Sequence, residues 1–293
     1  MDGQMKILSL CSGYGGLDMA VEQHFSAKTA YWSDVDKTAC AVMAARFPNA
    51  QPIGDLTTLD LTMMHADVVT AGYPCQPFSN AGNRLGEKDG RHLWPYLRNT
   101  ISVLRPRHVV LENVAGHLSL GAASVVGDLA ALGYDAKWTV IRASDVGAPH
   151  QRKRWFCVAA DSDSASSETW SNSRRDSEQP RQEPLGHSLP TTNTNSEGLE
   201  GFGRQHELRE ASEKKPFSWG CYDSAIRRWE RFLGRPAPLP VVDNRLSAVF
   251  VEWMMGLEEG HVTDIAPSRA KALACLGNGV VPQQAKRALE LLT

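Results

Sequence analysis

The sequence has almost no excess charge of either sign. Its 31 Lys and Arg residues nearly balance 33 Asp and Glu residues, and the formal net charge is -2. The global basic field that draws many proteins to nucleic acids is therefore absent. Any polyanionic partner has to be held by a local basic patch.

Signals for membranes, secretion and metals are also missing. No uninterrupted apolar run approaches ~18 residues, the length that predicts a membrane span. The first residues, MDGQMKILSL, carry an acid and are too short for a signal peptide. The six cysteines form no C-x-x-C pair, and no His/Cys cluster has zinc-ligand spacing. We expect a cytoplasmic protein with free thiols, no membrane contact and no metal.

Strand and helix patterns alternate through the first half of the chain. Two more apolar runs, 136–142 and 155–159, have the lengths of an antiparallel pair at a sheet edge. The alternation predicts an α/β fold with a mainly parallel sheet. The expected strands are 6–10, 30–33, 67–71 and 108–111, and the expected helices are 17–25, 37–47, 95–104 and 125–132.

The composition changes at residue 161. Residues 161–215 are rich in Ser, Asn, Glu, Arg and Gly and cannot build an ordinary core alone. They are either a disordered linker or a loop-rich surface that orders on a partner. Further helices are expected at 225–232, 247–255, 266–274 and 282–292. We divide the chain into a domain at 1–160, a polar region at 161–243, and a segment at 244–293 whose last helix returns to the first domain.

One loop carries a candidate nucleophile. Pro74-Cys75-Gln76 follows the expected strand 67–71, and ligands of open α/β sheets bind beyond the carboxyl ends of the strands. The flanking prolines restrict the loop backbone and hold the thiol in place. Free cysteines are also common as small buried apolar residues. The triplet by itself leaves both interpretations open.

A glycine-rich turn and two acids outline a nucleoside site. The first expected strand leads through Cys11-Ser12-Gly13-Tyr14-Gly15-Gly16 into a helix, and glycines there let a ligand approach the backbone closely. The spacing is not G-x-G-x-x-G, and a tight structural turn explains it equally well. Asp34 ends the second strand, where an acid accepts hydrogen bonds from ribose hydroxyls. Asp55 stands at the next strand end, where it would meet an adenine amine.

The ordered motifs GYGG, PCQ, ENV, QRKR and LGNGVVP resemble those of the DNA cytosine-5 methyltransferase family, bacterial or phage type. The resemblance implies a Rossmann-like S-adenosylmethionine-dependent methyltransferase fold, with 161–243 as a small loop-rich target-recognition domain. It implies methyl transfer from S-adenosylmethionine to carbon 5 of a flipped-out cytosine in double-stranded DNA. We expect a monomer, and three biological roles stay open: a restriction-modification system with a cognate restriction endonuclease as partner, an orphan regulator, and a phage's protection against host nucleases.

The resemblance assigns roles to individual residues. Cys75 would attack carbon 6 of cytosine, and Glu112 would hydrogen-bond ring nitrogen 3 and the exocyclic amine. Arg152 and Arg154 would anchor the base and the catalytic loop. The implied cofactor-binding residues are Cys11, Gly13, Tyr14, Gly15, Gly16, Leu17, Asp34, Asp55, Leu93, Asn278 and Gly279. The implied substrate-binding residues are Gln76, Ser79, Arg84 and Arg91, in a loop at 77–91 that would close on the flipped base.

Three positions depart from the family pattern. Cys11 replaces a phenylalanine that faces adenine, Ser9 replaces a common aspartate, and His150 replaces a glutamine. Two other functions stay open, an RNA cytosine-5 methyltransferase on the same scaffold and a non-catalytic nucleic-acid-binding remnant. The remnant is disfavoured because Cys75, Glu112 and both arginines are present.

Overall fold

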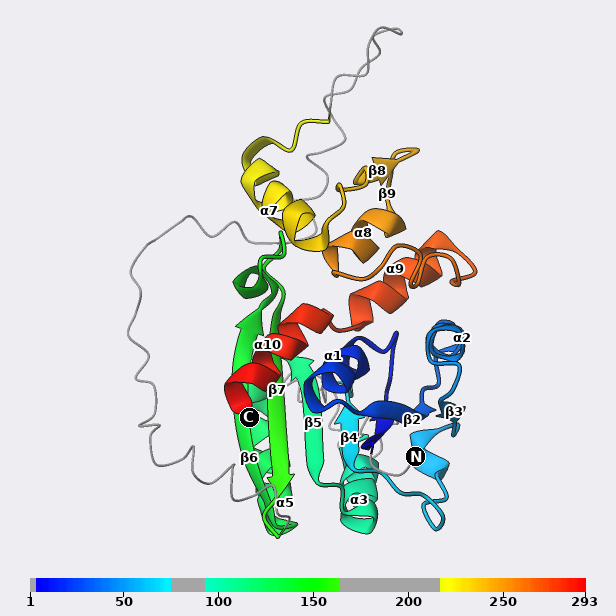
Figure 1. The fold of residues 1–293 in the computed structure, drawn as a ribbon, viewed down its shortest axis with the longest axis vertical. Coiled ribbons are helices and arrows are strands. Elements are labelled where there is room, and N and C mark those ends of the chain that lie inside the picture. The colour runs from blue at the N-terminus through cyan, green and yellow to red at the C-terminus, as the bar shows by residue number, and fades with distance from the viewer. Residues whose placement is uncertain (1–3, 75–92, 164–216) are drawn as a thin grey trace, which may run out of the picture.

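The computed structural model describes residues 4–74, 93–163 and 217–293, and a seven-stranded sheet organises them (Figure 1). The strand order is β3-β2-β1-β4-β5-β7-β6. The five strands from β3 to β5 are parallel, and β7 and β6 each run antiparallel to their neighbours. The predicted α/β fold and the predicted antiparallel edge pair are therefore confirmed. The strands are β1 Lys6–Leu10, β2 Lys28–Ser33, β3 Gln51–Pro52, β4 Val68–Ala71, β5 His108–Val114, β6 Tyr134–Arg142 and β7 Lys153–Asp161.

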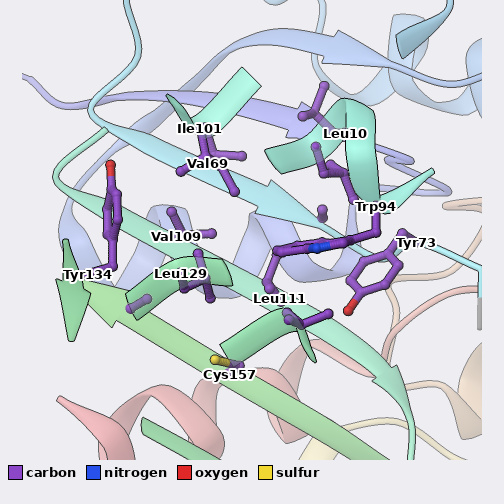
Figure 2. Close-up of a cluster of buried hydrophobic side chains, with 14 of the residues drawn as sticks. Leu10, Val69, Tyr73, Trp94, Ile101, Val109, Leu111, Leu129, Tyr134 and Cys157 are labelled. Carbon is purple, nitrogen blue, oxygen red and sulfur yellow. The ribbon is translucent and has the colours of Figure 1, made fainter. Parts of the chain in front are cut away.

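Helices cover both faces of the sheet, which is why its central strands read as continuous apolar runs. On one face, α3 and α5 pack over a core that includes Leu10, Val69 and Leu111 (Figure 2). On the other face, α1 and α10 pack over Ile7 and Val68. The helices are α1 Gly16–Phe25, α2 Lys37–Arg46, α3 Trp94–Leu104, α4 His117–Leu120, α5 Ala122–Ala131, α7 Asp223–Leu233, α8 Ala248–Met254, α9 Arg269–Asn278 and α10 Pro282–Leu292.

Most element boundaries lie close to the expected ones, and one differs for a clear reason. The helix expected at 266–274 begins at Arg269 and ends at Asn278. Ser268 sets its start, because its hydroxyl accepts a hydrogen bond from the Lys271 N–H, as an N-cap does. The short β3 is the strand expected to end before Asp55, and α4 was not expected. Among the helices that the structure describes, none has the length and apolar character needed to cross a membrane.

The last helix lies against the sheet beside α1 (Figure 1). Gln284 in this helix is fully buried, and its side-chain amide donates to the Ile141 carbonyl at 2.6 Å and the Arg152 carbonyl at 2.9 Å. These bonds satisfy two carbonyls at the ends of β6 and of the loop that follows it. They tie residues 282–292 to the end of β6 and to Arg152, which directly precedes β7.

Helices α7, α8 and α9 form a second cluster at one end of the sheet (Figure 1). Trp229 of α7 is fully buried and donates from its indole N–H to the Trp253 carbonyl of α8 at 3.0 Å. The same cluster contains Tyr14, so it shares apolar contacts with the glycine-rich turn. A hairpin of β8 Val241–Val242 and β9 Arg245–Leu246 spans the boundary predicted at 243/244. The three-part division of the chain stays a prediction.

A buried carboxylate organises the loop after α8. Glu252 is 1% exposed and accepts hydrogen bonds from the backbone N–H groups of Gly260, Val262 and Thr263 and from the Thr263 hydroxyl. This loop in turn supports the glycine-rich turn, because His261 Nε2 lies 2.9 Å from the Tyr14 carbonyl and donates to it.

We predict that Glu252→Ala lowers the free energy of unfolding by about 3 kcal/mol, because it leaves several buried donors without an acceptor. Urea unfolding followed by circular dichroism measures this change. Glu259→Ala is the matched control, since Glu259 is exposed on the same loop and its loss should cost less than about 0.5 kcal/mol. Equal unfolding midpoints for the two variants would contradict the prediction.

Candidate active site

A hollow lies beyond the carboxyl ends of β1, β4 and β5. The sheet order reverses between β1 and β4, and this reversal is where open α/β sheets bind ligands. Residues from the chain's first 20 positions and from 278–280 form opposite walls. The lining residues are Ser9, Leu10, Cys11, Ser12, Gly13, Gly16, Leu17, Asp18, Thr70, Ala71, Gly72, Glu112, Asn278, Gly279 and Val280.

The two walls approach each other so closely that glycine is required on both. A Cβ on Gly16 would lie 2.2 Å from the Val280 carbonyl oxygen, and one on Gly279 would lie 1.8 Å from the Tyr14 ring. The Tyr14 hydroxyl donates to the Val280 carbonyl at 2.6 Å. Tyr14 is thus fully buried behind the hollow, where it holds the far wall in place.

The acid that ends β2 shapes the glycine-rich turn. Asp34 accepts a hydrogen bond from the Gly13 N–H at 2.8 Å, and burial raises the pKa of its carboxyl. Cys11 lies beside Asp34 and Asp55, and burial together with these two charges raises the pKa of its thiol to about 12. The Cys11 thiol is therefore neutral and unreactive at physiological pH. The carboxylates of Asp34 and Asp55 thus lie beside the small Cys11 side chain at one end of the hollow.

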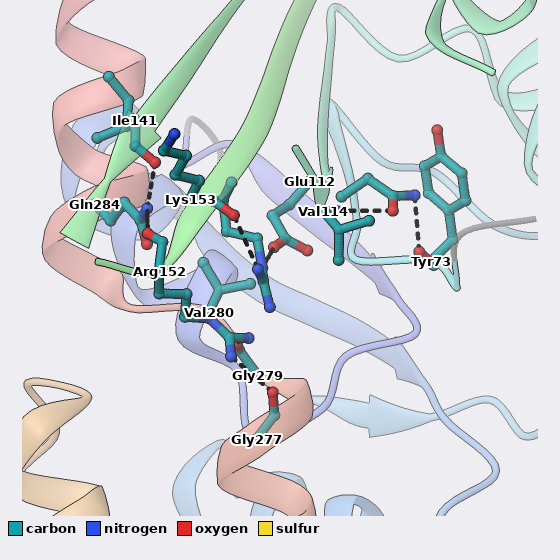
Figure 3. A network of polar contacts seen from close by, with 12 residues as sticks. Tyr73, Glu112, Val114, Ile141, Arg152, Lys153, Gly277, Gly279, Val280 and Gln284 are labelled. Carbon is teal, nitrogen blue, oxygen red and sulfur yellow. Dashed lines mark hydrogen bonds and ion pairs between the residues drawn. The ribbon is translucent and has the colours of Figure 1, made fainter. Parts of the chain in front are cut away.

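The buried pair of Glu112 and Arg154 stands at the other end (Figure 3). Arg154 Nε on β7 lies 2.7 Å from Glu112 Oε1 on β5. Burial raises the pKa of Glu112 to about 7, although Arg154 and Arg152 act to lower it. At neutral pH the group is therefore divided between its acid and its carboxylate. Its second oxygen faces Gly72, since a Cβ there would lie 3.5 Å from Oε2.

Arg152 has a different set of partners (Figure 3). Its guanidinium donates to the Gly277 carbonyl at 2.8 Å and to the Gly279 carbonyl at 2.5 Å. The two arginines expected to share one task thus lie in separate contacts, one with the glutamate and one with the turn at 277–279. His150 is neutral here, because burial lowers its pKa to about 4, and it donates to the Met254 carbonyl.

The residue before the Pro-Cys-Gln triplet is held from two sides. The Asn113 amide donates to the Tyr73 carbonyl at 3.0 Å (Figure 3), and the Tyr73 hydroxyl lies 2.9 Å from His117 Nε2. Tyr73 itself is buried against Trp94 (Figure 2). These contacts define the start of the loop. Cys75 and the predicted substrate-binding residues Gln76, Ser79, Arg84 and Arg91 lie outside the described residues.

The hollow gathers only some of the predicted cofactor-binding residues. Tyr14, Gly15, Asp34 and Asp55 support or flank the hollow without lining it, and Leu93 instead caps α3 and packs against the core. The predicted residues that line it are Cys11, Gly13, Gly16, Leu17, Asn278 and Gly279. Sequence reasoning gave no role to Ser12, Asp18, Thr70, Gly72 or Val280. For Asp18, the one available sequence signal was an acid next to the apolar positions 17, 20 and 21 of the first helix.

Asp18 is a second buried acid in the hollow. It is 1% exposed and accepts hydrogen bonds from the Ser9 hydroxyl at 2.7 Å and the Thr70 hydroxyl at 2.5 Å. Burial outweighs these bonds and raises its pKa to about 6. Of the two buried acids that line the hollow, Asp18 and Glu112, only Glu112 has a cationic partner among the described residues. Asp18 therefore places a buried acid without a cationic partner in the lining of the hollow.

Within the described ranges, no group of three His, Cys, Asp or Glu side chains is suited to hold a metal ion. The polar groups of the hollow are instead hydroxyls, backbone amides and carboxylates. Such groups are suited to bind an organic ligand.

Residues 5–231 match the family model for C-5 cytosine-specific DNA methylase. The chain is 31% identical over 175 residues to the Type II methyltransferase M.NlaIV of Neisseria lactamica, covering 54% of this chain and 41% of that protein. It is 33% identical over 177 residues to the Type II methyltransferase M.NaeI of Lentzea aerocolonigenes, covering 57% and 42%. The matches thus span less than half the length of these relatives.

Two solved structures share the fold. A DNMT2 mutant of Spodoptera frugiperda superposes with a TM-score of 0.63 at 17% identity, covering 99% of each chain. A putative DNA modification methyltransferase encoded within a prophage of E. coli superposes with a TM-score of 0.61 at 18% identity, covering 98% of each chain. The fold is therefore the Rossmann-like methyltransferase fold. Since the family model matches most of its length, the chain belongs to the C-5 cytosine-specific DNA methylase family.

Proposed function

We propose that the protein transfers a methyl group from S-adenosylmethionine to carbon 5 of cytosine in duplex DNA, through a covalent adduct on Cys75. The observation that carries the proposal is the buried Glu112–Arg154 pair, which borders the hollow next to Gly72, three residues before Cys75. The relatives in Neisseria lactamica and Lentzea aerocolonigenes, both named Type II methyltransferases, support duplex DNA as the substrate.

The hollow supports S-adenosylmethionine as the methyl donor. When bound, this cofactor supplies an electrophilic methyl group on a positively charged sulfur. The turn from Cys11 to Gly16 would line its nucleoside, with Asp34 at the ribose hydroxyls and Asp55 at the adenine amine. Residues 278–280 would close over it. Bound between these walls, the cofactor would be shielded from water.

Carbon 5 of cytosine is a weak nucleophile, so the protein has to activate the ring. In the proposed reaction the Cys75 thiolate forms a bond to carbon 6, and the electrons of the 5,6 double bond move into the ring. Glu112 in its acid form hydrogen-bonds ring nitrogen 3 and gives it a proton as charge develops there. Carbon 5 of the enamine-like ring would then accept the methyl group as the carbon–sulfur bond of the donor breaks. Loss of the carbon-5 proton to a base would expel the Cys75 thiolate, and ring nitrogen 3 would return its proton to Glu112.

Arg154 makes Glu112 suited to this task. The ion pair fixes the carboxyl orientation, so that Oε1 is held and Oε2 faces the space beside Gly72. A base in a duplex does not reach this buried group while stacked. The cytosine has to flip out, at a cost of a few kcal/mol that contacts in the site must offset. A monomeric state, a cytoplasmic location and a cognate restriction endonuclease stay predictions of the sequence.

We predict that Cys75→Ala abolishes methyl transfer, because no other group supplies the covalent step. Duplex DNA with 5-fluorocytosine at the target should trap the wild-type protein, since fluorine does not leave carbon 5 as a proton does. Denaturing electrophoresis and mass spectrometry of the adduct measure this. Cys221→Ala, which removes an exposed cysteine, is the control and should retain the adduct. Methyl transfer by Cys75→Ala would disprove the mechanism, and transfer to tRNA in preference to DNA would disprove the substrate.

The raised pKa of Glu112 predicts a pH dependence. Because the acid form is the active one, the single-turnover rate on DNA should fall as pH rises through about 7. Glu112→Gln should lower the rate by roughly 10²–10⁴ and remove this alkaline fall. Rapid-quench assays between roughly pH 6 and 9 measure both effects. A wild-type rate that only increases over this range would contradict an acid role for Glu112.

The two arginines should give separable phenotypes. Arg154→Met removes the larger of the two charges that lower the Glu112 pKa, so it should move the alkaline fall to higher pH further than Arg152→Met does. Arg152→Met removes the donors to Gly277 and Gly279, so it should weaken S-adenosylmethionine binding about tenfold or more. Isothermal titration calorimetry and the same pH profiles distinguish the two. Identical changes in both variants would show that the arginines act as one unit.

A further inference from the structure

Asp18 is the one carboxylate of the hollow to which the proposed chemistry gives no role. It sits in the first turn of α1, and its two oxygens are taken by hydroxyls from two neighbouring strands, Ser9 of β1 and Thr70 of β4. The Ser9 hydroxyl also lies 2.8 Å from the hydroxyl of Ser12 in the glycine-rich turn. A negative charge is thus held under the floor of the hollow by neutral donors alone.

The groups around Asp18 do not neutralise it. On its own helix Glu22 adds a second negative charge, which raises the Asp18 pKa further. The facing strands contribute the hydroxyls of Ser9 and Thr70, and β5 contributes Glu112, whose cationic partner is Arg154. Desolvation of an unpaired carboxylate is costly, so the site favours either a proton or a bound cation.

We propose that Asp18 is a cofactor-binding residue whose carboxylate provides the counter-charge for the sulfonium of S-adenosylmethionine. This inference rests on the proposed function, because it concerns the same hollow. The position agrees with the chemistry, since Thr70 and Gly72 are two residues apart on the strand that leads to Cys75. The methyl-bearing sulfur has to lie near that strand end for the methyl group to reach the base.

The proposal has a thermodynamic signature. Asp18 is partly protonated near pH 6 in the free protein, and a bound cation favours its ionised form. Binding of S-adenosylmethionine should therefore release protons, and by linkage its affinity should increase as pH rises through about 6. S-adenosylhomocysteine has the same nucleoside, ammonium and carboxylate groups without the sulfonium charge. It should release fewer protons, and its affinity should change less with pH.

The test is isothermal titration calorimetry of the full chain with each of the two ligands. Titrations in buffers of different ionisation enthalpy give the number of protons released. In Asp18→Asn, which keeps the shape but has one acceptor oxygen where Asp18 has two, so that one hydroxyl has to accept from the amide instead of donating, S-adenosylmethionine should bind about tenfold more weakly relative to S-adenosylhomocysteine. Glu22→Gln is the matched control. It removes one charge four residues further along the same helix, from a carboxylate that bonds the Thr29 N–H and only adds to the Asp18 pKa, so it should change the ratio of the two affinities far less than Asp18→Asn does.

The outcomes separate a charge role from a structural one. If Asp18 only ties α1 to the strands, Asp18→Asn weakens both ligands equally, and that result overturns the proposal. Equal proton release on binding of the two ligands to the wild-type protein also overturns the proposal. This measurement does not depend on the folding of any variant. If neither ligand binds the wild-type protein, the proposed function itself fails. If both bind with no dependence on ligand charge, only the inference about Asp18 fails.

Discussion

The closure of residues 277–280 on the glycine-rich turn is the contact on which the rest of the site depends. It joins segments more than 260 positions apart through the Tyr14 hydroxyl bond to Val280. Arg152 fixes the same segment from the opposite side through the Gly277 and Gly279 carbonyls. Glycines at 16 and 279 permit the close approach. Without this contact the hollow would have one wall.

Burial of acids is the second organising feature, and the structure uses it in three ways. Glu252 is satisfied completely by loop donors and acts as a structural anchor. Glu112 is paired with an arginine yet has a raised pKa, which suits an acid that shares a proton. Asp18 is held by hydroxyls without a cation. Under the proposals above, the same side-chain chemistry would thus serve stability, catalysis and ligand charge according to its partners.

Local patterns were enough to predict the sheet, because a strand buried on both faces is an apolar run in the sequence, as at Val68–Ala71. The motifs also located Glu112 and the glycine-rich turn. The partners of Arg152 could not be predicted from the sequence. They are backbone carbonyls, which every residue type has, so no sequence pattern identifies them. Asp18 escaped notice for a related reason. Its meaning comes from Thr70, 52 positions away, and only the folded sheet brings the two together.

The closure at 277–280 also has a consequence for synthesis of the chain. A nascent chain that has emerged from the ribosome only as far as α8 already contains the motifs for the nucleophile, the glutamate and both arginines. It lacks the second wall of the hollow, which the proposed function needs to retain a methyl donor. Under the proposed function, the capacity to methylate therefore arises only after residues 277–280 have been translated, and shorter nascent chains are expected to be inactive.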